Sequence, residues 1–419
     1  MAKKVLIMAG GTGGHIFPAL AIAKKLEAQG CEIQWVGTKD RMEAQLVPQY
    51  GYKIHFIEIK GLVSKGAKAW LKAPWQIFKA TLQARKIIKQ YKPDLIIGTG
   101  GYVCGPVGVA AQLTRTPLIV CENNGVMGLT NKLLSKFADL VLFAYPLEQA
   151  KKAEYVVGQP LRQEFTELNP LQNLANLYTK AANEFKLLQS FAQQENIQVA
   201  KELLEATEYN CKDYHALYQS LSAEQQAAFN RLSFSQQPLN ILAVGGSLGA
   251  QILNTHVAPA IKMLENKGIY THTFQQVGKD NALKVNELIT NLGLNQGKST
   301  YVAQEFITNM VEKYLASDLI ICRSGSMTVF EIASCNRPAI FVPLAVQKDQ
   351  QQLHNAEYLA KEQAAKIILN KDFTAEVLAD YICQLNYHEL YEMAKRQTRL
   401  ATPQATDKII EFVKPYLAS

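Results

Sequence analysis

The chain has 419 residues, of which 48% are hydrophobic and 19% are charged, and its formal net charge is +8. Its length exceeds the size at which a single hydrophobic core usually keeps growing, so we expect two domains. This composition is ordinary for a globular protein and excludes a disordered or fibrous chain. The seven cysteines are scattered and form no CxxC pair, which favours a reducing compartment and argues against a zinc site.

Strand-like apolar runs alternate with helix-like stretches at the start of the chain: KVLIMAG, EIQWVGT, KIHFIEI, DLIIGTG, TPLIVCE and DLVLFAY. This alternation predicts a doubly wound parallel sheet. The first run resembles a signal peptide only faintly, because glycines follow it at once and no cleavage site closes it. Two longer uncharged runs are interrupted by glycine, proline or polar residues, so neither is expected to cross a bilayer.

Residues 60–92 carry nine basic side chains and no acidic one, with Trp70, Trp75 and Phe78 interleaved. The pattern suits an anionic membrane surface, where each nearby lysine or arginine contributes about 1 kcal/mol. A solvated helix face whose aromatic side chains lie in the core explains the pattern as well, and both interpretations stay open. No nucleic-acid partner is expected, because no recognised binding motif accompanies the charge.

The strand rhythm stops after GQPLRQEF, and residues 163–237 carry helix formers at helical spacing without a strand pattern or a catalytic constellation. We interpret this stretch as a helical insertion. The rhythm resumes with NILAVGG, THTFQQVG, TYVAQEF, DLIICRSG, PAIFVPL and AAKIILN, which predicts a second α/β domain. The expected domains are therefore residues 1–162 and 238–402, and a closing helix occupies residues 403–419.

Four glycine-rich loops follow predicted strand ends: GGTGGH, GTGGYVCG, GGSLGA and RSGSMTVFE. Glycine lets a ligand approach the backbone, and the amides at a helix start favour an anion. One such loop is weak evidence, but four of them lie where open α/β sheets bind ligands. NAD binding is disfavoured because Ile16 replaces the third glycine of GxGxxG and Thr38 ends the second strand. No loop carries the lysine of an ATP-binding P-loop.

Seven motifs, taken together in their order along the chain, are specific enough to indicate a family. They are GGTGGHIFPALAIA, GTGGYVCGP, ENNGVMGLTNK, GQPLR, GGSLGA, CRSGSMTVFEIA and QQQLHNA. Together they resemble the family of peptidoglycan N-acetylglucosaminyltransferases, and the likeness covers both α/β domains. The resemblance implies the GT-B fold, with two Rossmann-like domains facing each other across a cleft.

The resemblance also implies an activity and its partners. Enzymes of this family move N-acetylglucosamine from UDP-N-acetylglucosamine to the muramyl hydroxyl of an undecaprenyl-pyrophosphoryl-N-acetylmuramyl-peptide. The reaction takes place at the cytoplasmic face of the cell membrane, to which such an enzyme binds peripherally. Other cell-wall synthesis proteins are expected as further partners.

Residue by residue, the resemblance places most donor contacts in the second domain. These residues are Ser247, Ile307, Ser326, Met327, Thr328, Val329, Phe330, Glu331 and Gln351. The first domain adds Thr12, Gly13, Gly14, Asn124 and Arg162. Glu331 suits the role because a carboxylate accepts two ribose hydroxyls, although an exposed helix glutamate is the alternative. For Arg162 the alternative is a salt bridge at the domain boundary.

His15 is the expected general base, because a single displacement at the anomeric carbon needs one base and an imidazole with a pKa of about 6.5 suits neutral pH. Tyr102 and Glu122 are expected to orient the ring or the acceptor. Glu122 is the chief alternative base, and His15 is then only a binding residue. The chain has no DxD motif, so we expect no obligatory metal or other cofactor, since helix N-termini can stabilise the departing UDP.

Some positions depart from the family's usual pattern. Leu248 stands where glutamine is frequent, Asn123 where glutamine is usual, and Gln159 where asparagine is usual. The helical insertion has no counterpart in the family's short interdomain linker. Two other classes of protein remain as alternatives. A UDP-sugar epimerase of the same form would lack the aromatic and basic face, and a non-catalytic binding protein would have lost His15 or Glu331.

Overall fold

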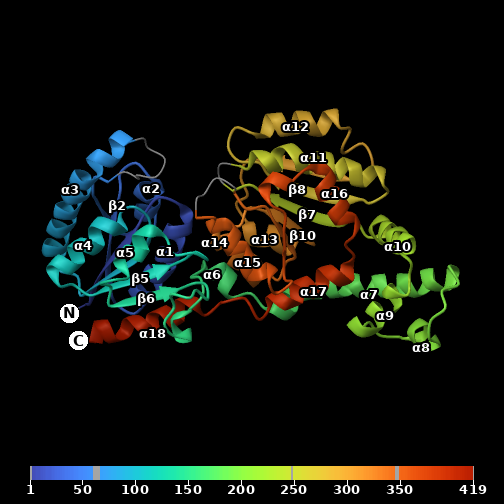
Figure 1. Ribbon diagram of the computed structural model, residues 1–419, viewed down its shortest axis with the longest axis horizontal. Helices are drawn as coiled ribbons and strands as arrows, with labels where there is room; N and C mark the ends of the chain where they lie inside the picture. The colour runs from blue at the N-terminus through green and yellow to red at the C-terminus, as the bar shows by residue number, and fades with distance from the viewer. Residues whose placement is uncertain (1, 60–66, 247–248, 345–348, 419) are drawn as a thin grey trace. The chain divides into compact units, whose positions relative to one another are not determined.

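The computed structural model describes residues 2–59, 67–246, 249–344 and 349–418, and for residues 67–72 it describes the backbone alone. The chain divides into two compact units (Figure 1). The first unit comprises Met1–Glu167, Gly325–Phe330 and Thr402–Ser419, and the second comprises Leu168–Ser324 and Glu331–Ala401.

The first unit is built on a parallel sheet whose strand order is β3-β2-β1-β4-β5-β6. Its strands are β1 (Lys4–Ala9), β2 (Glu32–Gly37), β3 (Lys53–Phe56), β4 (Leu95–Gly100), β5 (Leu118–Glu122) and β6 (Leu140–Phe143). Each lies in one of the six predicted runs. The chain winds one way from β1 to β3 and the other way from β4 to β6, and ligands bind in such sheets where the order reverses, between β1 and β4.

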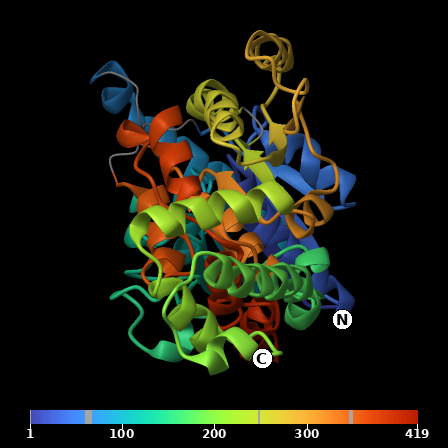
Figure 2. The same ribbon diagram turned by 90° about the vertical axis from the view of Figure 1, so that its right-hand side faces the viewer.

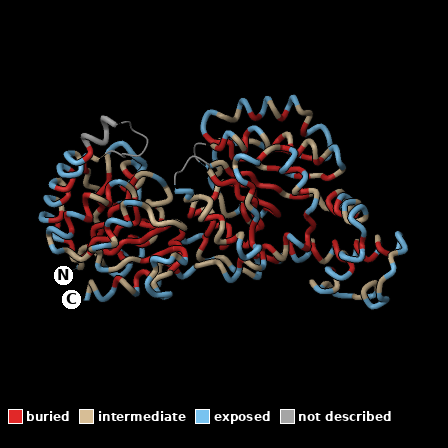
Figure 3. Tube along the Cα trace, viewed as in Figure 1, coloured by how far each residue is buried: buried red, intermediate tan, exposed pale blue. Residues whose placement is uncertain are grey.

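Helices cover both faces of this sheet, because alternate side chains of each strand point to opposite faces. Val5 and Ile7 of β1 pack in one apolar cluster, whereas Leu6 and Met8 pack in the other. The first cluster includes residues of α1 (Gly13–Ala28), α2 (Met42–Gln49) and α18 (Ala405–Ala418). The second includes residues of α3 (Ala67–Tyr91), α4 (Cys104–Thr114) and α5 (Leu129–Leu134). Figure 3 shows the buried strands between these helices.

The second unit repeats this topology with the strand order β12-β11-β10-β7-β8-β9. Its strands are β7 (Leu239–Val244), β8 (Thr271–Gln276), β9 (Thr300–Gln304), β10 (Leu319–Cys322), β11 (Ala339–Phe341) and β12 (Lys366–Ile367). Its α/β helices are α11 (Gln251–Asn266), α12 (Ala282–Asn291), α13 (Met310–Leu315), α15 (Gln351–Ala360), α16 (Ala375–Cys383) and α17 (Tyr387–Gln397). Helix α14 (Ser326–Cys335) is divided between the two units.

The predicted insertion is helical. It consists of α6 (Gln163–Thr166), α7 (Pro170–Gln194), α8 (Lys201–Glu205), α9 (Cys211–Gln219) and α10 (Ala223–Gln236). Leu174, Leu177 and Phe234 belong to the main core of the second unit, and Lys180 Nζ lies 2.6 Å from the buried carboxylate of Asp318. The long helix α7, green in Figure 2, is therefore part of the second unit, which begins at Leu168.

Within the described residues, none of the helices is both long and apolar enough to span a membrane. Helix α3 nevertheless carries apolar side chains on its surface. Trp75 is 69% exposed and Phe78 is 52% exposed, and their ring centroids lie 5.8 Å apart. The interpretation that these two aromatic residues belong to the core is therefore wrong. The side chains of Trp70 and of the basic residues at positions 60–72 lie outside the described part of the chain.

Candidate active site

The predicted GGTGGH loop, residues 10–15, joins the end of β1 to the first turn of α1. Thr12 is the N-cap residue of α1, but its side chain makes no capping hydrogen bond, and the first turn contains no acidic residue. The first amides of a helix have no partner inside the helix, and they favour an anionic or partly negative ligand. Gly13 and Gly14 are the first two residues of α1 and directly precede His15 in the chain.

His15 is fixed by an irregularity in the neighbouring strand. The pairing between β1 and β4 steps from Gly98 to Gly100, so that Thr99 is left outside the ladder. The free carbonyl of Thr99 accepts hydrogen bonds from His15 Nδ1 at 3.0 Å and from Asn123 Nδ2 at 2.8 Å. The Thr99 hydroxyl donates back to the main-chain oxygen of His15 at 2.7 Å. This β-bulge orients the imidazole, as bulges near active sites often do.

The hydrogen bond with Thr99 determines the tautomer of His15. A carbonyl oxygen can only accept, so Nδ1 carries the proton and Nε2 of the neutral ring keeps its lone pair. Loss of solvation lowers the pKa of His15 from its ordinary value, while Glu122, the bond to Thr99 and Glu43 act in the opposite direction. The ring is therefore neutral near pH 7, and two carboxylates favour the imidazolium that forms when Nε2 takes a proton.

A close approach at Gly100 makes room for this ring. A Cβ atom added at Gly100 would collide with Nδ1 and Cε1 of His15, so any other residue there would displace the imidazole. The adjacent Tyr102 is 43% exposed, and it lies in the loop between β4 and α4. The second predicted glycine loop, GTGGYVCG, therefore lies directly against the first.

Glu122, at the end of β5, is buried and holds the loop that follows it. Its Oε1 accepts hydrogen bonds from the amide and the side chain of Asn124, at 2.9 and 3.2 Å. Its Oε2 accepts from the amide of Gly128 at 3.0 Å and from Asn131 Nδ2 at 2.8 Å. With four donors already bound, the carboxylate shapes the loop that presents Asn124.

Glu43 is the main residue that sequence analysis missed. It lies in the first turn of α2 with its side chain fully buried, and it accepts a hydrogen bond from the amide of Gly11 at 3.0 Å. One signal in the sequence pointed to its burial: the apolar residue Val47 lies four positions further along, and residues four apart share a helix face. Val47 is indeed buried in the structure. Thr99 gave no such signal, since its role comes from a bulge that the sequence pattern does not show.

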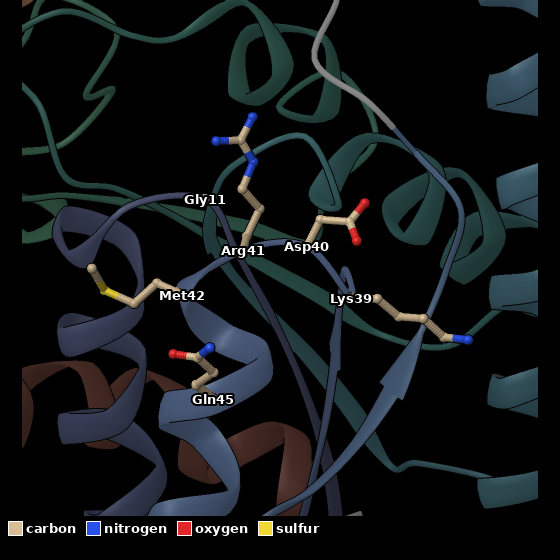
Figure 4. A pocket seen from close by; sticks show the side chains of 6 residues that line it. All are labelled: Gly11, Lys39, Asp40, Arg41, Met42 and Gln45. Carbon is tan, nitrogen blue, oxygen red and sulfur yellow. The ribbon is translucent and has the colours of Figure 1, made fainter.

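A pocket of about 440 Å³ opens beside the glycine-rich loop (Figure 4). Gly11 lines one side, and the segment between β2 and α2 together with the first turns of α2 lines the other: Lys39, Asp40, Arg41, Met42 and Gln45. These five side chains are exposed, and their polar groups make no hydrogen bond or ion pair with the described residues. The pocket is therefore polar and carries charges of both signs, and its lining residue Gly11 precedes His15 by four positions in the chain.

Arg162 and Ser326, two further predicted donor-site residues, contact other residues of the first unit. Arg162 pairs with Glu164 at 2.9 Å, as in the salt-bridge alternative, and its guanidinium also lies 5.8 Å from the centre of the Phe17 ring in α1. The hydroxyl of Ser326, at the start of α14, donates to the carbonyl of Asn123. Gln159 contacts the same turn through the sulfur of Met327, at 3.2 Å.

The remaining predicted donor-site residues differ in accessibility. Val329 and Phe330 are completely buried, so their side chains belong to the protein interior, whereas Thr328 is partly exposed. Glu331 is 8% exposed, Gln351 begins α15, and Ile307 lies in the loop after β9. Ser247 lies outside the described residues. Within the described part of the chain, no cluster of three or more histidine, cysteine or acidic side chains is arranged to hold a metal ion.

Known proteins match both units. The glycosyltransferase family 28 N-terminal domain matches residues 5–143, and the C-terminal domain of that family matches residues 240–409. Relatives from Actinobacillus pleuropneumoniae serotype 5b and Haemophilus influenzae are 42% and 41% identical, each with 99% of both chains covered. Both are named UDP-N-acetylglucosamine–N-acetylmuramyl-(pentapeptide) pyrophosphoryl-undecaprenol N-acetylglucosamine transferase.

Solved structures give the same assignment. Acinetobacter baumannii MurG matches with a TM-score of 0.73 and 32% identity, and 99% of both chains is covered. A UDP-N-acetylglucosamine 2-epimerase matches with a TM-score of 0.58 at 13% identity, covering 99% of this chain and 96% of the other, which shows a common fold alone. The chain therefore has the GT-B fold and belongs to glycosyltransferase family 28, among the N-acetylglucosamine transferases named above.

Proposed function

We propose that this protein is an inverting glycosyltransferase of peptidoglycan synthesis. It transfers N-acetylglucosamine from UDP-N-acetylglucosamine to the 4-hydroxyl of the muramyl sugar in undecaprenyl-pyrophosphoryl-N-acetylmuramyl-pentapeptide. The substrates are those named for relatives that are about 42% identical over the whole chain. The observation in the structure that carries the proposal is His15, whose Nδ1 is bound to Thr99 and whose Nε2 has a lone pair to accept a proton.

The proposed reaction is a single displacement. The acceptor hydroxyl gives its proton to Nε2 of His15 as its oxygen bonds to the anomeric carbon, and the bond from that carbon to the UDP oxygen breaks. The electron pair leaves with UDP, so negative charge grows on the pyrophosphate, and amides at helix N-termini can stabilise it. A positioned base of this kind contributes about 10² to 10⁴ in rate.

In this proposal Glu122 supports the reaction by positioning other residues, and it is not the base. Its carboxylate accepts four hydrogen bonds from residues 124–131, so taking a proton would break the loop's anchoring. We propose that Glu122 holds Asn124 in the substrate site and stabilises the His15 imidazolium electrostatically. Tyr102, exposed in the next loop, is proposed to contact the acceptor.

The donor is proposed to bind chiefly at the carboxyl ends of β7, β9 and β10, which are strands of the second sheet. Glu331 is proposed to accept both ribose hydroxyls, and Gln351 lies at the start of a neighbouring helix. The segment after β10 contacts the start of this helix, because the Ser324 hydroxyl donates a hydrogen bond to the carbonyl of Gln352 at 2.7 Å. Thr12, Gly13, Gly14, Asn124 and Arg162 are proposed to contact the donor from the first unit.

The proposed location is the cytoplasmic face of the cell membrane, where the lipid-linked acceptor lies. Helix α3 supports a peripheral contact, since Trp75 and Phe78 are exposed beside Lys79, and Arg85 and Lys86 are exposed one to two turns further along. Exposed aromatic rings can enter the headgroup region while basic groups attract anionic lipid. Other cell-wall synthesis proteins acting on the same lipid-linked substrate are proposed as further partners.

A transfer assay tests the function. Labelled UDP-N-acetylglucosamine is incubated with a water-soluble lipid-linked acceptor analogue, and both the disaccharide product and released UDP are measured. We expect UDP release only in the presence of acceptor, and a β-linkage in the product. Acceptor-independent conversion of the donor to its 2-epimer or to free UDP would instead show an epimerase, and donor binding without turnover would show a binding protein.

The membrane contact is tested separately. The double variant Trp75→Ser/Phe78→Ser should bind anionic phosphatidylglycerol vesicles several-fold more weakly than the wild type, while transfer to the soluble acceptor is unchanged. Leu171→Ser provides a matched control, because Leu171 is an 80% exposed apolar residue of the second unit. Equal vesicle binding by all three proteins would remove α3 from the proposed contact.

A further inference from the structure

Glu43 joins two segments that lie on opposite sides of the pocket. Its Oε2 accepts the amide of Gly11 in the glycine-rich loop, at 3.0 Å. Its Oε1 accepts the amide of Thr38 at 3.0 Å and the hydroxyl of Thr38 at 2.7 Å, in the segment that follows β2. Each carboxylate oxygen therefore serves a different segment, and one side chain links them.

The backbone is shaped around this carboxylate. A Cβ atom added at Gly10 would lie 2.6 Å from Oε1 of Glu43, so Gly10 leaves the space that the side chain occupies. The side chain of Glu43 is 0% exposed, and a buried charge is costly unless it is fully hydrogen-bonded. An apolar residue at the same position would leave the two amides and the Thr38 hydroxyl without their acceptor, so the carboxylate and the two segments depend on each other.

Both linked segments line the pocket, and one of them leads to His15. The glycine-rich loop leads directly into the turn that bears His15, and Gly11 forms one wall of the pocket. The segment after β2 forms the other wall with Lys39, Asp40 and Arg41. A change in the distance between these walls alters both the pocket and the position of His15.

We propose that Glu43 is a positioning residue for sugar transfer, which holds the glycine-rich loop against the segment after β2 and so keeps His15 and the pocket in place for the acceptor. This inference rests on the proposed function. Two carboxylates act on His15 through space, Glu122 from β5 and Glu43 from α2, and each raises the pKa of the imidazole. Glu43 therefore influences the proposed base by charge as well as by geometry.

Three variants separate these effects. Glu43→Gln keeps the shape and removes the charge, and its NH₂ group must face one of the amides that the carboxylate bound. Glu43→Asp keeps the charge, but its shorter side chain cannot reach both segments. Thr38→Val removes a single donor from Oε1 and leaves the bond to Gly11 intact, so it serves as the matched control.

For transfer, we expect kcat/KM for the acceptor to fall about ten- to a hundredfold in Glu43→Gln and Glu43→Asp, because a buried amide loses its acceptor. Thr38→Val should lose less than about threefold. The affinity for UDP should change less than kcat/KM in all three variants, because most donor contacts are proposed outside the glycine-rich loop. Wild-type kcat/KM in both Glu43 variants would overturn the proposal, as would a fall no larger than that of Thr38→Val.

A second readout does not depend on activity. Proton NMR titration of the His15 ring, assigned by comparison with His15→Gln, should give a lower pKa in Glu43→Gln than in the wild type. Thr38→Val and Glu43→Asp should stay close to the wild type, because they keep the charge. An unchanged pKa in Glu43→Gln would overturn the charge effect. Absence of transfer by the wild-type protein would instead count against the proposed function, and the titration would still decide whether Glu43 acts on His15.

Discussion

Two regions of the molecule hold buried glutamates whose hydrogen-bond partners differ in kind. At the glycine-rich edge of the first sheet, Glu43 and Glu122 accept hydrogen bonds mainly from loop amides. In the helical part of the second unit, Glu184 of α7 accepts the Tyr214 hydroxyl, the Ser233 hydroxyl and the amide of His388. The first pair shapes loops that we propose to face substrate, whereas Glu184 connects four helices to one another. Burial alone therefore does not identify a functional carboxylate, because its partners decide what its loss would change.

The largest effect is expected at the glycine-rich edge. His15→Ala should lower kcat by about 10² to 10⁴, because it removes the group proposed to take the acceptor's proton. UDP affinity, measured by calorimetry, should stay nearly the same, and so should the thermal midpoint of unfolding. A variant that keeps its turnover and only binds the acceptor more weakly would make His15 a binding residue.

The second largest effect should be a loss of stability in the helical part of the second unit, without a loss of catalysis. Glu184→Ala leaves three buried donors without an acceptor, which we expect to lower the local free energy of unfolding by about 3 kcal/mol. Hydrogen exchange of the α7 and α17 amides measures this quantity. Ser233→Ala removes one of the three contacts and should cost about 1 kcal/mol. A loss of turnover in Glu184→Ala at temperatures where it stays folded would contradict a purely structural role for Glu184.

Much of the fold could be predicted because its signals are local. The strands of the described residues lie within predicted apolar runs, except that β7 begins one residue earlier, at Leu239, and the stretch from 163 to 237 is helical as its spacing indicated. The attachment of α7 to the second core could not be predicted, because Lys180 meets Asp318 across 138 positions of sequence. The site shows the same division. His15 stood in a recognisable motif, whereas Glu43 is a single glutamate whose importance comes from Gly11, 32 positions away.

A pH dependence sharpens the comparison in the helical region. His388 stacks on Tyr214 at 4.2 Å between ring centroids, and Tyr209 Oη lies 2.8 Å from its Nδ1. Burial lowers the pKa of His388 to about 4, below the ordinary value of about 6.5. The unfolded chain therefore binds more protons between these values, so this contribution to stability is present above pH 6.5 and is lost as the pH falls towards 4.

Between pH 7 and pH 5, the free energy of unfolding of the wild type should fall by about 2 kcal/mol more than that of His388→Gln. Urea unfolding followed by circular dichroism at the two pH values measures it. His272→Gln, at an exposed histidine of β8, is the matched control and should follow the wild type. If His388→Gln keeps the full pH dependence, another group is responsible.

The smallest effect is expected for a carboxylate that is not buried among fixed donors. Glu357 pairs with Lys361 one turn further along α15, at 3.1 Å, and the lysine side chain is 74% exposed. Lys361→Ala should change the free energy of unfolding by less than about 0.5 kcal/mol, since water and salt screen such pairs. Urea unfolding at low and high salt checks this, and a loss above 1 kcal/mol would show that exposure does not separate the two kinds of carboxylate.

The closing helix α18 has a consequence for how the protein is made. Ile409, Ile410 and Val413 complete the same apolar cluster as Val5 and Ile7, yet the chain between Glu167 and Thr402 mostly builds the other unit. At a synthesis rate of about 5–20 residues per second, the ribosome needs about 10–50 s to cover that distance. Throughout that interval one face of the first sheet is covered by α1 and α2 but still lacks the apolar side chains of α18. A premature stop codon near the end of the message would therefore damage the part of the protein that is translated first.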